Sequence, residues 1–145
     1  MQGLTVAERV AAAPWWRWPI GCAVRTPGCA DLLRVVGHQH VQRAPHLRLR
    51  VHARGLVELT MRATACAPAL DDDATAALLL AALWAHDPEW HTHHDAEGYV
   101  AHVDPRRGEW TAGVRGEALA LAALACLGEN GMAGVWPAIK TRGEP

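Results

Sequence analysis

The stretch that decides the fold covers residues 71–103, which read DDDATAALLLAALWAHDPEWHTHHDAEGYVAHV. Its three aspartates supply a helix N-cap and the negative charge that a helix N-terminus favours, so we predict a helix over residues 74–85. Pro88 ends this helix, because proline lacks a backbone N–H and clashes with the preceding turn. Two short strands are predicted next, over residues 90–94 and 99–103, joined by a turn at residues 95–98.

Toward the C-terminus the pattern returns to a third strand at residues 109–111 and a helix over residues 116–127, which Gly128 ends. Each helix carries one apolar stripe, made of Ala76, Leu79, Leu80 and Leu83 in the first and of Ala120, Leu121, Leu124 and Leu127 in the second. Residues 69–131 are therefore predicted to form an α-β-β-(β)-α unit, in which two helices lie on a small antiparallel sheet.

Toward the N-terminus the first element is a short helix. Thr5 and Glu8 have the spacing of a capping box, and the helix is predicted to run to about Ala13, before Pro14. Strand patterns follow over residues 32–36, 47–52 and 56–61. We expect the first of these strands to end at Gly37 and a turn at residues 53–55 to join the other two.

These elements predict an α+β protein with a small antiparallel N-terminal sheet preceded by a short helix and followed by the α-β-β-(β)-α unit. We expect three regions: a β-rich basic subdomain at 1–68, an acidic subdomain at 69–131 and a loosely held tail at 132–145. Residues 1–70 contain nine arginines and three acidic residues, whereas residues 71–145 contain twelve acidic residues and five basic ones. This asymmetry indicates either an anion-binding front half or two halves that attract each other.

The composition also bears on where the protein acts. No apolar run approaches the roughly 20 residues of a membrane span, and the first thirteen residues lack the pattern of a secretory signal. Four cysteines without CxxC spacing favour reduced thiols, and Cys66 and Cys126 have the alanine and leucine neighbours of core residues. We therefore expect a cytoplasmic protein with no membrane partner.

Capping and turn signals carry one family resemblance. The segment Pro68-Ala69-Leu70-Asp71-Asp72-Asp73-Ala74-Thr75, the strand Gly98-Tyr99-Val100-Ala101 and the helix start Gly116-Glu117-Ala118-Leu119-Ala120 resemble the "phage ABA sandwich" proteins. The resemblance covers most of the chain and is strongest over residues 68–128. It implies a phage- or prophage-encoded accessory protein that acts by binding inside a bacterial cell, for example against a host defence system, and it transfers no catalytic residue.

Tryptophans gather at one predicted corner, Trp15-Trp16-Arg17-Trp18, which proline and glycine residues surround. Aromatic rings beside guanidinium groups are typical of surfaces that stack bases or anchor a partner. The alternative is that a protein without phenylalanine uses tryptophan for its core. The sequence leaves both open.

A basic strand face is the second candidate surface. Arg48, Arg50 and His52 alternate with apolar residues, so they are predicted to share one face of a strand. That face would suit an acidic protein surface or a phosphate backbone. The alternatives are an ordinary solvated face, or one that pairs with the acidic second half of the chain.

The histidines form the third candidate. His91 and His93 share a face of one predicted strand, and His102 lies on the next strand. Three imidazoles would suit a divalent metal with one position left for water. The alternative is a solvated sheet face on which histidine takes the place of threonine or arginine, and it is favoured because no carboxylate or cysteine completes a recognised zinc motif.

No pattern predicts catalysis. The sequence has no glycine-rich phosphate loop and no His-Glu-x-x-His, and serine is absent. We therefore expect a non-enzymatic binding protein without a cofactor, which meets a host bacterial protein through Trp15, Trp16, Arg17, Trp18, Arg48 and Arg50. Nucleotide or nucleic-acid binding by the basic half is the alternative, followed by a metal-dependent hydrolase at His91, His93 and His102.

Overall fold

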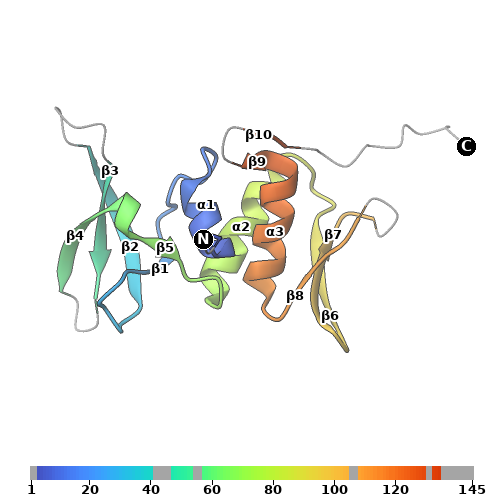
Figure 1. The fold of residues 1–145 in the computed structure, drawn as a ribbon, viewed down its shortest axis with the longest axis horizontal. Helices are drawn as coiled ribbons and strands as arrows, with labels where there is room; N and C mark the ends of the chain where they lie inside the picture. The colour runs from blue at the N-terminus through green and yellow to red at the C-terminus, as the bar shows by residue number, and fades with distance from the viewer. Residues whose placement is uncertain (1–2, 41–46, 54–56, 105–107, 130–131, 135–145) are drawn as a thin grey trace, which may run out of the picture.

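The computed structural model describes residues 3–40, 47–53, 57–104, 108–129 and 132–134, which are arranged in three layers (Figure 1). A layer of helices lies between a five-stranded sheet and a three-stranded sheet. The helices are α1 (Val6–Ala12), α2 (Asp73–Trp84) and α3 (Arg115–Leu127). The predicted α+β class is confirmed, and so is the capping box, because Glu8 N donates to Thr5 Oγ1 at 3.2 Å.

The larger sheet is antiparallel throughout. Its strands follow the spatial order β4 (Glu58–Arg62), β3 (Leu47–His52), β2 (Leu33–His40), β1 (Ala23–Arg25) and β5 (Ala67–Pro68). The 3₁₀ turn η1 (Ala63–Ala65) leads the chain from β4 at one edge to β5 at the other. The sheet is thus completed by residues 67 and 68, which were predicted only as the end of the N-terminal region.

The prediction that a strand ends at Gly37 is wrong. β2 continues to His40, and its pairing with β3 shifts register between Val35 and Gly37, which marks a bulge. The Arg50 side chain lies over this glycine, since a Cβ there would stand 3.2 Å from Arg50 Nη1. Glycine therefore allows the bulge and the close approach of an arginine, and it does not end the strand.

The smaller sheet contains β6 (His91–Asp95), β7 (Gly98–His102) and β8 (Trp110–Ala112), again antiparallel. α3 lies against β7 and β8, whereas α2 packs mainly against α3. Of the two helices predicted for this unit, α3 makes the main contact with the sheet and α2 packs on α3. A short ribbon of β9 (Gly128–Glu129) and β10 (Met132–Ala133) follows α3, and residues 135–145 of the predicted tail lie outside the described residues.

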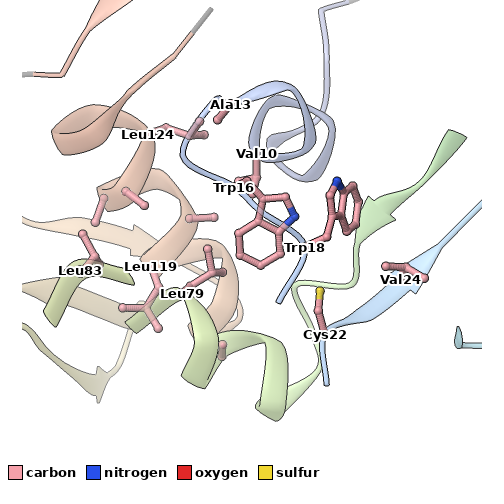
Figure 2. Packing of buried hydrophobic residues seen from close by; sticks show 14 of the residues in the cluster. Val10, Ala13, Trp16, Trp18, Cys22, Val24, Leu79, Leu83, Leu119 and Leu124 are labelled. Carbon is pink, nitrogen blue, oxygen red and sulfur yellow. The ribbon is translucent and has the colours of Figure 1, made fainter. Parts of the chain in front are cut away.

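Helix α3 is buried on nearly every side. Of the predicted stripe, Ala120 and Leu124 are buried, whereas Leu121 and Leu127 are half-buried. Outside the stripe, Ala118, Leu119, Ala122 and Ala123 are inaccessible to solvent. The expectation of a single stripe was too narrow because α3 occupies the middle layer, in contact with α1 and α2 as well as the sheet. One continuous core runs from Val10 and Trp16 through Leu79 and Leu119 (Figure 2), across the expected boundary at residues 68 and 69.

Cys66 and Cys126 are buried, as their neighbours predicted. None of the helices in the described part of the chain has the length and apolar character that crossing a membrane requires.

Candidate functional site

Three arginines of the front half form ion pairs with acidic residues of the back half. The pairs are Arg9 with Glu129, Arg25 with Asp71 at 3.0 Å, and Arg34 with Asp72 at 3.0 Å. The interpretation that the two halves attract each other is thereby supported. These pairs also reduce the positive charge available to a phosphate backbone, because each neutralises one arginine inside the molecule.

Asp72 is the most elaborate of these contacts. Its carboxylate caps helix α2 by accepting hydrogen bonds from Thr75 N at 2.9 Å and Thr75 Oγ1 at 3.0 Å. The Arg34 guanidinium, followed by the Thr75 hydrogen bonds, lowers the pKa of Asp72. Arg34 also donates to the Gly21 carbonyl oxygen at 2.7 Å. This arginine therefore has a structural role, tying the start of α2 to the large sheet.

The basic strand face is confirmed as a face but is partly neutralised. Leu49 and Val51 are buried, and Arg48, Arg50 and His52 lie on the other side of β3. Arg50 donates through Nη2 and Nε to Glu58 Oε1, at 2.7 and 3.0 Å. Arg48 makes no ion pair with any described residue. Arg43 and Arg54, which flank this strand in the sequence, lie outside the described residues.

The tryptophan corner belongs to the core. Trp16 and Trp18 are only 6% and 3% exposed, and their rings meet edge to face with centroids 6.0 Å apart (Figure 2). Trp15 is half-buried and donates from Nε1 to the Gly128 carbonyl oxygen at 2.8 Å. The expectation that the Trp16 and Trp18 rings project from the surface toward a partner is corrected, because hydrophobic burial encloses both rings and leaves only a small part of Trp18 at the surface, in the wall of a hollow. Arg17 is exposed.

The Trp18 backbone is strained. Trp18 has a φ of 51°, the only positive φ of a non-glycine residue among the described residues. A bulky side chain rarely adopts this conformation, and such strain persists only where neighbouring groups hold it. His38 Nε2 lies 2.6 Å from the Trp18 carbonyl oxygen, so the imidazole donates a hydrogen bond that helps to hold it.

A groove runs beside this corner, between α1 and the segment from η1 to β5. It consists of two adjoining hollows of about 330 and about 530 Å³, which share Glu8, Thr64 and Cys66 in their walls. We call it the α1 groove. The smaller hollow is also lined by Leu4, Ala11, Ala12, Trp18 and Ala63, and the larger by Thr5, Ala7, Arg25, Thr26, Pro27, Cys29, Ala65, Ala67 and Pro68.

The lining suits binding by contact. The smaller hollow is mostly alanine, leucine and tryptophan, and the larger adds threonine hydroxyls and one guanidinium. Burial raises the pKa of the Cys66 thiol, so this sulfur is protonated at neutral pH and offers an apolar contact. No sequence pattern predicts this groove, apart from the run of small residues 63–69 between a strand and a helix.

The three predicted histidines do come together. His91 and His102 are direct cross-strand partners with ring centroids 4.2 Å apart, and His93 Nδ1 lies 3.0 Å from His102 Nε2. His91 Nδ1 donates to the Glu89 carbonyl oxygen at 2.9 Å. Within the part of the chain that the structure describes, however, no three histidine, cysteine or carboxylate side chains are placed to hold a metal ion. Metal binding at these residues stays a prediction.

The histidine cluster predicts a pH dependence of stability. Burial, and then the nearby His91 and His93, lower the pKa of His102, against weaker opposite effects of Glu109 and Asp104. The unfolded chain therefore takes up this proton near pH 6.5 and the folded chain only below that value. The contribution of His102 to the free energy of unfolding is therefore fully present above pH 6.5 and is lost as the pH falls through the folded-state pKa. For this single group the free energy of unfolding changes by at most about 1.4 kcal/mol per pH unit.

We expect urea denaturation at several pH values between 7.5 and 5 to show this loss, and we expect His102→Asn to flatten the curve in that window. Asp72 and Glu129 do not confound the result, because their pKa values are lowered from 3.8 and 4.5 and act at more acidic pH. If the free energy of unfolding varied with pH in the same way for the wild type and for His102→Asn, His102 would not be the source of the pH dependence.

No protein-family model, curated protein or solved structure matches this chain. Of the residues predicted to meet a partner, the structure places Arg48 and Arg50 on the large sheet and Trp18 in the wall of the α1 groove.

Proposed function

We propose that this protein is a non-enzymatic binding protein that holds an apolar segment of a partner protein in the α1 groove. In the setting that the family resemblance implies, the protein is a phage- or prophage-encoded accessory protein, and the partner is a bacterial host protein in the cytoplasm. Interference with a host defence system is the role that such binding would serve.

The observation that carries the proposal is the α1 groove itself. Binding sites for small ligands and short segments are typically concave and mainly apolar, with a few polar groups that set orientation. The groove has this character: Ala11, Ala12 and Trp18 form apolar walls, while Thr26 and Arg25 supply polar groups at the other end. The linings of the two hollows together run from Leu4 to Ala12, so an extended or helical segment lying along α1 would contact both hollows.

Backbone strain at the groove wall supports the same site. Residues held in rare conformations cluster where a protein binds or reacts, because the strain persists only under functional or structural constraint. Trp18 lines the smaller hollow and carries the positive φ noted above. The predicted involvement of the tryptophan corner is thus kept for Trp18, as part of a groove wall.

Filling the groove should abolish partner binding. Thr64 is exposed and lies in the walls of both hollows, so Thr64→Trp places a large ring where the bound segment would lie. Affinity capture from host lysate should recover proteins with the wild-type chain that the Thr64→Trp chain loses by at least tenfold.

The matched control is Ala81→Trp, which adds the same ring at an exposed position of α2. This variant should recover the same proteins as the wild type, and circular dichroism should show all three chains folded. If Thr64→Trp recovers every protein that the control recovers, the groove is not the contact site.

A further inference from the structure

The edge strand β4 offers a second surface, separate from the α1 groove. Among the described strands, β4 pairs with β3 alone and ends the large sheet on that side (Figure 1). Glu58, Leu59, Thr60 and Arg62 are exposed, and only Met61 is half-buried. An edge of this kind presents unpaired backbone N–H and C=O groups that can pair with another strand.

The two faces of β4 differ in chemistry. Leu59 and Met61 lie opposite Val51 and Leu49, so they extend the apolar face of the sheet that covers the core. Leu59 is 38% exposed, and Val57, on the same face, is 54% exposed. Glu58, Thr60 and Arg62 alternate with them on the other face. The edge therefore ends in an apolar row that nothing described in the chain covers fully.

We propose that a second copy of this chain pairs with β4 in antiparallel fashion, about a two-fold axis at Thr60. In that register Glu58 of each chain faces Arg62 of the other, and Leu59 faces Met61. The strand is thus complementary to itself in both charge and apolar character, as an interface with two-fold symmetry requires. The pairing would join two five-stranded sheets into one continuous sheet.

The charges on β3 and β4 favour pairing of β4 with a second copy of this chain over pairing with an unrelated strand. Arg62 stands directly opposite Arg48, and like charges at such positions are destabilising. No described carboxylate forms an ion pair with either arginine. A copy brings Glu58 to Arg62 at each end of the pairing and so supplies the missing carboxylate.

Glu58 can make this contact without leaving its present partner. Both hydrogen bonds from Arg50 go to Glu58 Oε1, and no described group bonds to Oε2. In the dimer Oε2 is the acceptor for Arg62 of the copy. Each Glu58 would then link an arginine of its own chain to one of the other.

The size of the contact sets its strength. Five residues of edge strand form a small interface, at the low end of those that hold proteins together, so we expect a reversible dimer. Its ion pairs are exposed and therefore weaken in salt. Sedimentation equilibrium in low salt should show an average mass that rises toward twice the monomer mass as protein concentration increases.

Charge reversal gives the decisive test. Arg62→Glu should remain folded, because glutamate at 62 would lie opposite Arg48, yet should stay monomeric because it would face Glu58 of the copy. Glu58→Arg should also stay monomeric. The double variant, and an equal mixture of the two single variants, should recover association to within threefold of the wild type, since opposite charges face each other again.

Arg17→Glu is the matched control: it reverses the same charge at an exposed residue that is not part of β4, and its association should equal that of the wild type. The proposal is overturned if the wild type is monomeric at all concentrations, if Arg62→Glu associates as strongly as the wild type, or if the double variant fails to recover. Glu58→Arg could fail to fold because Arg50 loses its partner. In that case the association of Arg62→Glu, compared with that of Arg17→Glu, still tests the proposed dimer.

Discussion

Gly116→Ala is expected to destabilise the protein by about 3 kcal/mol, the upper part of the usual range for forcing extra atoms into a packed site. A Cβ at position 116 would stand 2.0 Å from the Leu70 carbonyl oxygen, which is backbone and cannot rotate away. In an exposed helix the same change stabilises by up to about 1 kcal/mol, because alanine is the better helix former. A loss of stability, in place of the gain expected in an exposed helix, would therefore show how closely the first turn of α3 approaches the start of α2.

The measurement is urea denaturation followed by circular dichroism at 222 nm. Gly113→Ala provides the control, since a Cβ at that position meets no atom within 4 Å, and it should change the free energy of unfolding by less than about 0.5 kcal/mol. If Gly116→Ala proved neutral or stabilising, α3 would not lie against Leu70 as the structure has it.

Trp16→Ala is expected to cost about 3–5 kcal/mol of stability, the range for removing a large buried aromatic side chain. The Trp16 ring is 6% exposed and packs in the middle of the core, edge to face with Trp15 and Trp18. Alanine would leave a cavity that α1 and α3 could fill only by moving. The loss should appear as a lower denaturation midpoint with a similar dependence on urea.

This variant also separates two interpretations of the tryptophan corner. If Trp16 were a surface contact, its replacement would weaken partner binding and leave stability almost unchanged. The neighbouring Arg17→Ala serves as control, because Arg17 is exposed and should change stability by less than about 0.5 kcal/mol. A Trp16→Ala protein as stable as the wild type would place this ring outside the core.

Much of the secondary structure follows from local signals. The capping box at Thr5 and Glu8 marks the start of α1, and Asp72 with its neighbours marks the start of α2, because each cap acts within one turn of helix. Strand alternation in β3 correctly predicts which face carries Arg48 and Arg50. Such signals depend on neighbours in the sequence and are therefore visible in it.

The candidate sites could be predicted only in part. Cross-strand pairing of His91 with His102 follows from a hairpin between adjacent strands, so the sequence indicates it. The α1 groove has α1 on one side and η1 with β5 on the other, and no local pattern connects these two distant parts of the chain. The open edge of β4 likewise depends on the strand order of the sheet, since alternation alone does not show which strand lies at the edge.

The sequence by itself determined the α+β class, the helix caps and the alternation of apolar and basic residues, because hydrogen bonds and side-chain directions within one element set them. Only the tertiary structure decided that Trp16 and Trp18 belong to the core and that Arg9, Arg25 and Arg34 form ion pairs with the acidic half of the chain. The physical reason is that burial and ion pairing depend on how elements from distant parts of the chain pack together, and here the helices pack between two sheets. A run of tryptophan and arginine has the same pattern in the sequence whether it faces solvent or the core.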